Sequence, residues 1–270
     1  MSATFKLDGR VVPFAEGQTI IEAAIAAGIY IPHLCYHPDF KPHGSCKLCT
    51  VEVNGRQMAS CTLKAAAGMV VASDTPELND ERRALTQMLF VEGNHFCPSC
   101  EKSGDCKLQA TAYDLGMMSP HYDHFLPDRP VDASHPELLL DFNRCILCSL
   151  CVRASRDVDR KSVFGLSGRG IKTRLIVNAK SGRLADTDIG VADKAVHVCP
   201  VGVILRKGGT VSLSELVAFL MHKEIARFKL PERLEVLEDF PVSTFGKVSK
   251  KALVELVTAK LEEEAKARAR

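Results

Sequence analysis

The sequence has no tryptophan and almost no excess of charge of either sign. Its 270 residues carry a formal net charge of +2, which is too small to indicate attraction to nucleic acid or to an anionic membrane surface. We therefore expect no nucleic-acid partner. The missing tryptophan excludes no class of function.

The sequence also lacks a long hydrophobic run and a secretory signal. Its most apolar stretch, residues 20–31, contains Glu22 and is too short to span a bilayer. The N-terminus has no basic segment followed by an apolar one, as a signal peptide would. These absences predict a cytoplasmic protein, or one at the inner face of a membrane complex, with no direct membrane insertion.

No glycine fingerprint for a flavin or nicotinamide dinucleotide follows a predicted strand. Gly165, Gly168 and Gly170 lie close together, but their spacing is not that of G-x-G-x-x-G. We therefore expect no catalytic residues and no complete substrate site in this chain. Any chemistry of this protein must therefore depend on residues other than a dinucleotide-binding glycine motif.

Cysteine is the residue type that stands out. The chain has eleven cysteines, an odd number that cannot all pair as disulfides, so a reducing compartment is indicated. They occur in three groups with short spacings instead of singly. Such grouping favours metal binding over the packing of isolated buried thiols.

The first set is Cys35, Cys46, Cys49 and Cys61, spaced C-x10-C-x2-C-x11-C. Four thiolates suit the iron of a [2Fe–2S] cluster, although the spacing is not that of plant ferredoxins. A structural zinc site is the alternative, because C-x2-C pairs also bind zinc. Zinc sites usually contain two close pairs, whereas this set has one. The set therefore favours a [2Fe–2S] cluster over zinc.

The second set is Cys97, Cys100 and Cys106, with His95 two residues before its first cysteine. Three cysteines need a fourth ligand for a [4Fe–4S] cluster. A neutral imidazole in place of a thiolate makes a cluster less negative and should raise its reduction potential. The alternative is that His95 is an exposed loop histidine. The missing fourth cysteine favours the ligand.

The third set is Cys145, Cys148 and Cys151, with the remote Cys199 followed by Pro200. C-x2-C-x2-C with a distant C-P is a specific pattern for a [4Fe–4S] cluster. Zinc would use two of the three close cysteines and leave a thiol over. Together the three sets use every cysteine in the chain. We predict metal and cofactor ligation by twelve residues: Cys35, Cys46, Cys49 and Cys61; His95, Cys97, Cys100 and Cys106; Cys145, Cys148, Cys151 and Cys199.

The pattern of elements predicts an α+β protein that begins with a β-grasp domain. Asp8-Gly9 and Asn54-Gly55 each separate two short strand-like runs and indicate hairpins. Thr19 and Glu22 form a capping-box pattern that predicts a helix. The predicted strands are residues 4–7, 10–14, 50–53, 56–59 and 70–72. Strand, strand, helix and later strands are the order of a β-grasp fold.

Beyond residue 75 we predict a helix over residues 76–90, capped by Thr75. Its apolar stripe would include Leu78, Leu85, Met88 and Leu89. A cysteine-rich loop, a short helix over 107–115 and an irregular connector over 116–137 follow. The predicted domains are 1–77 (β-grasp, [2Fe–2S]), 78–118 (one histidine and three cysteines, [4Fe–4S]), 119–208 (all-cysteine, [4Fe–4S]) and 209–270.

Residues 1–207 resemble the iron–sulfur diaphorase (gamma) subunit of NAD-reducing, bidirectional [NiFe] hydrogenases. They are more distantly similar to the N-terminal region of the complex I 75-kDa subunit and of iron-only hydrogenases. Complex I-like relatives place the ligand histidine four positions before the first cysteine of its set, where this chain has Gly93, whereas hydrogenase-type sequences resemble this chain, with His95. The resemblance is carried by residues 31–35, 92–104, 145–157, 181–186 and 197–204.

The resemblance implies one [2Fe–2S] and two [4Fe–4S] clusters in this chain, with FMN and NAD bound in a partner. It implies two kinds of partner: a flavin/NAD-binding diaphorase subunit, and the small and large subunits of a [NiFe] hydrogenase. The leading hypothesis is an oxidoreductase subunit that passes single electrons between them. An equivalent subunit of a complex I-like enzyme or of an NAD-dependent formate dehydrogenase is the alternative. A zinc-stabilised scaffold is a hypothesis of a different class.

Residues 210–270 resemble a different family, the C-terminal subdomain of adenylate-forming acyl-CoA or aryl-acid ligases. Segments 214–220, 225–232 and 241–250 carry this likeness, and Lys247 matches a lysine that assists adenylation there. The large ATP-binding domain of that family is missing, and a single lysine without a nucleotide pocket cannot do the chemistry. We expect an appended remnant or docking module, with a fusion artefact as the alternative; an adenylating enzyme is a third hypothesis for the function.

Three arginines near the third set are candidates for tuning its cluster. Arg144, Arg153 and Arg156 could raise the potential of that cluster by their positive charge. The alternative is that they form salt bridges on the surface or toward a partner.

Overall fold

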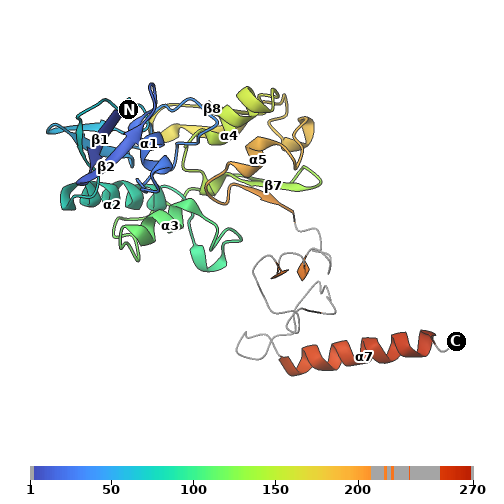
Figure 1. Cartoon of the computed structure of the whole chain (residues 1–270). Coiled ribbons are helices and arrows are strands. Elements are labelled where there is room, and N and C mark those ends of the chain that lie inside the picture. The colour runs from blue at the N-terminus through green and yellow to red at the C-terminus, as the bar shows by residue number, and fades with distance from the viewer. Residues whose placement is uncertain (1–2, 208–215, 218–219, 222–230, 232–249, 269–270) are drawn as a thin grey trace. The chain divides into compact units, whose positions relative to one another are not determined.

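The computed structural model describes residues 3–207, 216–217, 220–221, 231 and 250–268. The chain divides into two compact units, Met1–Lys207 and Gly208–Arg270 (Figure 1). The first unit contains all eleven cysteines. The boundaries predicted inside it, at 77/78 and 118/119, stay predictions.

Five strands near the N-terminus form one mixed sheet. They are β1 (Ala3–Leu7), β2 (Arg10–Phe14), β3 (Thr50–Val53), β4 (Arg56–Ala59) and β5 (Val70–Ala72). Their order is β2-β1-β5-β3-β4; β1 runs parallel to β5, and the other neighbours are antiparallel. The helix α1 (Ile20–Ala26) follows β2 in the chain and lies beside β1 and β2 in Figure 1. The predicted β-grasp domain is confirmed.

Both hairpins turn at the predicted dipeptides. The φ angles are +49° at Asp8 and +78° at Gly9, and +51° at Asn54 and +76° at Gly55. Two-residue hairpin loops of this kind need positive φ at both positions, which asparagine, aspartate and glycine tolerate. Local turn chemistry therefore sets the register of both strand pairs.

The capping box of α1 forms as predicted. The Thr19 N–H donates to the Glu22 carboxylate at 2.7 Å, and the Glu22 N–H donates to the Thr19 hydroxyl at 3.4 Å. The helix places Ile20 and Ile21 in the core of the β-grasp domain, where they are fully buried. That core also contains Cys49 and Cys61, so two predicted ligands lie within its packing.

The helix α2 (Pro76–Val91) follows β5 in the chain. Thr75 caps it by accepting a hydrogen bond from the Leu78 N–H at 3.2 Å. The predicted apolar stripe is wrong at one position, because Met88 is 48% exposed. Arg82 is buried on the inward face instead, 3% exposed. The helix α3 (Lys107–Asp114) follows the cysteine-rich loop.

The rest of the first unit is built from short elements around a second core. A three-stranded sheet has the order β10-β7-β6, and a two-stranded sheet pairs β8 with β9. Leu34, Leu108 and Leu140, one from each predicted domain, belong to one core cluster. The bounds are β6 (Val131–Asp132), β7 (Leu138–Asp141), α4 (Leu150–Arg153), β8 (Phe164–Ser167), β9 (Arg174–Val177), α5 (Lys194–His197) and β10 (Ile204–Arg206). The predicted irregular connector contains β6.

In the second unit the structure describes the helix α7 (Lys250–Arg268). Lys247 and almost all of residues 210–249, which carry the ligase-like segments, lie outside the described residues. Among the residues that are described, no helix is long and apolar enough to cross a membrane.

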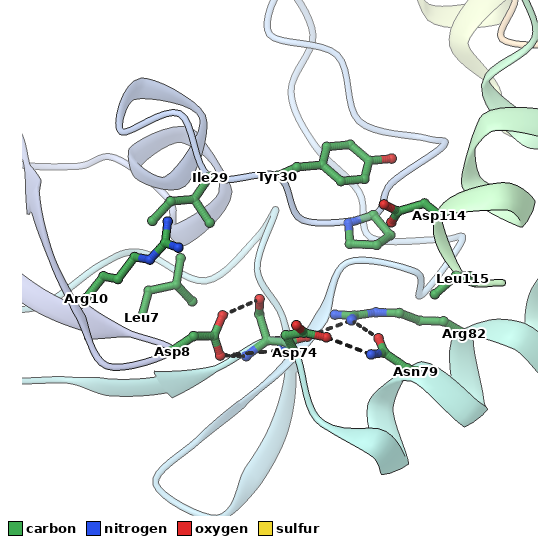
Figure 2. A pocket seen from close by; sticks show the side chains of 12 residues that line it. Leu7, Asp8, Arg10, Ile29, Tyr30, Asp74, Asn79, Arg82, Asp114 and Leu115 are labelled. Carbon is green, nitrogen blue, oxygen red and sulfur yellow. Dashed lines mark hydrogen bonds between the residues drawn. The ribbon is translucent and has the colours of Figure 1, made fainter.

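A polar network joins the β-grasp sheet to α2 beside a cavity of about 520 Å³ (Figure 2). The Asp8 carboxylate accepts hydrogen bonds from the Ser73 N–H at 2.6 Å and the Ser73 hydroxyl at 2.8 Å. Arg82 donates to the Ser73 carbonyl at 2.6 Å and to the Asn79 side chain at 2.9 Å. None of the twelve predicted ligands lines this cavity. The network therefore holds the two elements together.

Candidate metal centres

The first set gathers where a long loop meets the end of β4. Cys35, Cys49 and Cys61 are buried, and Cys46 is half-buried. Cys46 and Cys49 flank Lys47, whose φ of +59° makes the loop between them tight. The backbone N–H of Cys46 points at the Cys35 sulfur, 3.5 Å away.

The four thiols of the first set meet as two pairs. A hydrogen bond from the Cys46 thiol lowers the pKa of Cys35 to about 4, and one from Cys61 lowers the pKa of Cys49 to about 6. The same bonds raise the pKa of Cys46 and of Cys61. In each pair one thiol is thus shifted toward the thiolate, the form that binds metal. Two pairs suit a two-iron cluster, because each iron takes two protein ligands.

The second set lines one cavity around the start of α3. His95, Cys97, Cys100 and Cys106 all contribute to its wall. Cys106 directly precedes α3, and Cys97 begins a 3-10 turn that ends at Ser99. The structure therefore brings the histidine together with the three cysteines.

His95 presents a nitrogen with no other partner. Its Nε2 atom is buried and makes no hydrogen bond, which costs about 1–3 kcal/mol for a buried polar group. Burial, helped by the charge of Arg144, lowers the pKa of His95 to about 4, so the imidazole is neutral. The Phe90 ring packs edge-on against it, with ring centroids 5.6 Å apart. A neutral, oriented, unsatisfied nitrogen fits a metal ligand.

Gly93 leaves the space in which the His95 ring lies. A Cβ atom at position 93 would be 2.7 Å from His95 Nε2, which is far too close. A side chain at residue 93 and the imidazole of His95 in this position therefore exclude each other. This explains how a histidine at 95 can accompany a glycine at 93.

The third set also lines one cavity. Cys145, Cys148, Cys151 and Cys199 form part of its wall, and Leu147, Val201 and Val203 make most of the remainder apolar. Burial raises the pKa of Cys145 to about 11 and raises the pKa of Cys148 and Cys151 further. Their thiols are therefore neutral until a cation stabilises the thiolates. The lining is largely apolar, as suits a redox centre held away from solvent.

No disulfide competes with these sites, because all eleven cysteines are free thiols. Within the described residues, no three His, Cys, Asp or Glu side chains converge as ligands of a single metal ion would. In a cluster each cysteine binds its own iron corner or shares an iron with one other, so the sulfurs stand further apart than around one zinc. The donor types and the two cavities fit clusters.

The third set lies next to both other sets. Arg153, two residues after Cys151, donates to the Cys35 carbonyl of the first set at 2.5 Å. On the other side, the Lys107 N–H beside the second set donates to the Pro200 carbonyl at 2.9 Å. The third set therefore contacts both other sets through hydrogen bonds to backbone carbonyls.

The structure places the three arginines that could tune the third set in different surroundings, and their effect on its cluster stays a prediction. Arg144 extends to the second set, with Nη1 3.5 Å from Cys100 Sγ. Arg153 is 7% exposed and donates to backbone carbonyls, those of Lys41 and Cys35. Arg156 is exposed and pairs with Asp157, so the alternative of a surface salt bridge holds for it. Arg144 also forms ion pairs, but its own side chain is largely covered.

Sequence reasoning missed Arg82. Its guanidinium also donates to the Leu48 carbonyl at 2.9 Å and the Thr50 carbonyl at 2.7 Å, on either side of Cys49. Arg82 therefore holds the backbone on both sides of Cys49, where β3 begins. Its position four residues after Leu78, on the inward face of α2, is the signal that could have found it.

Three family models match the chain, in the order of the three cysteine sets. Residues 2–76 match a 2Fe-2S iron-sulfur cluster binding domain. Residues 82–121 match the NADH-ubiquinone oxidoreductase-G iron-sulfur binding region, and residues 138–205 match a 4Fe-4S single cluster domain. The three matches end before the second unit.

Curated relatives are similar over the first unit. The gamma subunit of the NAD-reducing hydrogenase HoxS of Cupriavidus necator is 40% identical over 208 residues, covering 77% of this chain and 88% of the relative. The mitochondrial NADH-ubiquinone oxidoreductase 78 kDa subunit of Candida albicans is 32% identical, covering 74% and 28%. The alpha subunit of a Geobacter sulfurreducens NADPH-Fe(3+) oxidoreductase is 30% identical, covering 74% and 24%. The chain thus spans most of the first relative and less than a third of the other two.

A chain in a crystal structure of an NAD+-reducing [NiFe]-hydrogenase in the H2-reduced state has the same fold. It is 55% identical in sequence, with a TM-score of 0.75. The match covers 79% of this chain and 92% of that one. Sequence and structure comparisons therefore agree on the same kind of complex.

Proposed function

Because this chain belongs to the family of iron–sulfur gamma subunits of NAD-reducing hydrogenases, we propose that it is the electron-transfer subunit of such an enzyme. It carries one [2Fe–2S] and two [4Fe–4S] clusters, each of which supplies one-electron oxidation and reduction when bound. The observation that carries this function is the gathering of all eleven free cysteines and His95 into three sets, one within each family match.

We assign the clusters to the predicted ligands. Two thiol pairs in the first set, the orphaned His95 nitrogen in the second and the apolar cavity of the third support the assignment. The ligands of each cluster lie on loops that are anchored by the starts of helices and the ends of strands. Its side chains exclude water from the third site, and N–H groups donate hydrogen bonds to sulfur at the first and second.

The partners are a flavin/NAD-binding diaphorase subunit, which holds FMN and NAD, and the small and large subunits of a [NiFe] hydrogenase. The names of the HoxS relative and of the crystal structure support this reading. A subunit of a complex I-like enzyme is less favoured, because those relatives are 30–32% identical to this chain, whereas the HoxS gamma subunit is 40% identical. The cytoplasm is the proposed location, since eleven free thiols suit a reducing compartment.

Purification of the chain with its clusters tests the function. We expect a brown protein whose broad visible absorption bleaches on reduction, with iron and sulfide in the ratio of one two-iron and two four-iron clusters. Together with a diaphorase subunit, NADH should reduce it. A colourless protein with stoichiometric zinc and no iron would establish the scaffold instead.

Replacing His95 with alanine is expected to remove or alter one four-iron signal in paramagnetic resonance and to leave the two-iron signal unchanged. The reason is that, among the described residues lining that cavity, His95 carries the one buried side-chain nitrogen or oxygen atom without a hydrogen-bond partner. His124→Ala is the matched control, because His124 is an exposed loop histidine. A spectrum of His95→Ala with all three clusters as in the wild type would show that His95 is not a ligand.

A further inference from the structure

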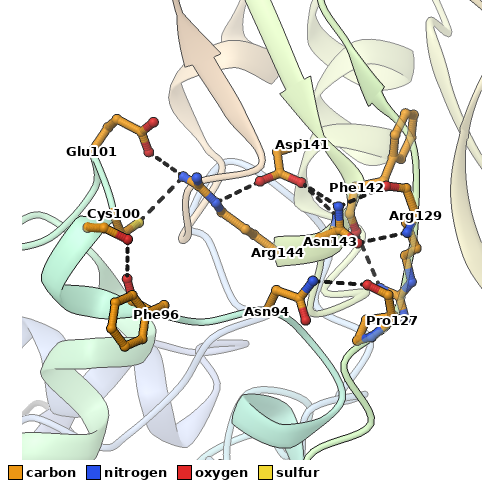
Figure 3. A network of polar contacts seen from close by, with 11 residues as sticks. Asn94, Phe96, Cys100, Glu101, Pro127, Arg129, Asp141, Phe142, Asn143 and Arg144 are labelled. Carbon is orange, nitrogen blue, oxygen red and sulfur yellow. Dashed lines mark hydrogen bonds and ion pairs between the residues drawn. The ribbon is translucent and has the colours of Figure 1, made fainter.

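Arg144 connects the loop of the third set to a sulfur of the second. It ends the 3-10 turn Phe142–Arg144, directly before Cys145. Its side chain extends to the second set, where Nη1 lies 3.5 Å from the sulfur of Cys100 (Figure 3). The charge therefore acts on a ligand 44 residues away in the sequence.

Two carboxylates hold the guanidinium in this position. Nε donates to Asp141 at 2.8 Å, and Nη1 donates to Glu101 at 2.5 Å (Figure 3). The Asp141 side chain is 12% exposed, whereas that of Glu101 is 59% exposed. Asp141 thus fixes the guanidinium from the inside, and Glu101 faces solvent.

One nitrogen serves both Cys100 and Glu101. Nη1 carries two hydrogens, so it can donate to the sulfur and to the carboxylate at the same time. The negative charge of each acceptor weakens the electrostatic effect of the guanidinium on the other acceptor. Glu101 follows Cys100 directly in the sequence. The sulfur therefore shares its donor with the neighbouring acid.

Gly202 provides the room for this contact. A Cβ atom there would lie 3.1 Å from Arg144 Nη1 and 3.4 Å from the Cys100 sulfur. A larger residue would push the guanidinium or the sulfur aside. The glycine comes from the loop after Cys199, so the third set shapes this contact from two sides.

We propose that Arg144 is a positioning residue that raises the reduction potential of the second cluster by donating to the Cys100 thiolate, and that Glu101 limits this effect. The inference rests on the proposed function, since it requires a cluster at the second set. The sign follows from charge: reduction adds an electron to an already negative group, and a cation bonded to its ligand sulfur stabilises the reduced form more. Arginine stays protonated, so the effect persists across physiological pH.

Redox titration of the cluster-loaded full chain, followed by paramagnetic resonance, tests the proposal. Loss of a signal in Cys106→Ser identifies the second cluster. In Arg144→Gln we expect the ratio of reduced to oxidised second cluster at a fixed potential to fall about tenfold, equivalent to about 59 mV for one electron. In Glu101→Gln the ratio should rise about threefold, less because Glu101 is exposed and screened. Arg144→Lys should lie between wild type and Arg144→Gln.

Arg156→Gln is the matched control. Arg156 is an exposed arginine paired with Asp157, and its loss should move no potential. An unchanged second cluster in Arg144→Gln, or an equal shift of both four-iron clusters, overturns the proposal. If Arg144→Gln fails to assemble the cluster, Glu101→Gln decides: a raised potential supports the proposal, and an unchanged or lowered one overturns it. A wild-type chain without the signal of the second cluster overturns the proposed function itself.

Discussion

Replacing Cys199 with serine is expected to remove one [4Fe–4S] cluster and to unfold residues 138–206 more readily than any surface change. Cys199 joins the loop after α5 to three cysteines far earlier in the chain, so its bond to a cluster closes a long loop. Such a site has no counterpart in the unfolded chain, and its binding free energy is folding free energy. We expect a loss of at least about 3 kcal/mol, in the range of severe single substitutions.

Iron analysis, paramagnetic resonance and hydrogen exchange measure this outcome. The iron content should fall by one four-iron cluster, and exchange should accelerate in β7, α4 and β10. Cys61→Ser is the companion variant, which should lose the two-iron signal and keep both four-iron signals. An unchanged iron count in Cys199→Ser would refute the ligand assignment.

Replacing Arg82 with alanine is expected to destabilise the first unit by about 3–5 kcal/mol, because it leaves several buried carbonyl groups without a hydrogen-bond donor. The guanidinium donates to the carbonyls of Leu48, Thr50 and Ser73, and Arg82 is 3% exposed. These carbonyls belong to the segments that place Cys49 and join β5 to α2. Chemical denaturation of the cluster-loaded chain measures the change, and we expect earlier loss of the two-iron signal with it.

Arg83→Ala is the matched control for Arg82→Ala. Its side chain is 39% exposed and forms an ion pair with Asp80 one turn earlier on α2. Exposed pairs of this kind contribute about 0–1 kcal/mol. If both variants lost the same stability, the buried hydrogen bonds of Arg82 would not be what stabilises this joint.

Local patterns predicted the β-grasp domain well, for reasons visible in particular residues. Asp8-Gly9 and Asn54-Gly55 turn the chain by their own tolerance of positive φ, and Thr19 caps α1 through a residue three positions away. Interactions of this range do not depend on the rest of the fold. The prediction that Met88 is buried was wrong, because helical periodicity predicts an apolar face but not which elements pack against it. In the structure the inward face of α2 includes Arg82 instead of Met88.

His95 shows where spacing alone was not enough. It stands only two residues before Cys97, and so short a spacing does not reveal where the imidazole points. The structure adds that Gly93 leaves the room for its ring and that its Nε2 atom has no other partner. Its ligand role stays a prediction, now with a spectroscopic test.

The sequence by itself determined where the three cysteine sets lie in the chain and where the hairpins of the β-grasp domain turn, because cysteine spacing and turn chemistry are encoded within short stretches. Tertiary structure alone decided which charges act on which set. Arg144 meets Cys100 across 44 residues and Arg153 meets Cys35 across 118, and both contacts exist because packing brings the third set against the other two. An arginine that is next to one cysteine set in the sequence can therefore donate a hydrogen bond to another set. Side-chain direction and loop packing decide which partner it contacts, and both depend on the tertiary structure.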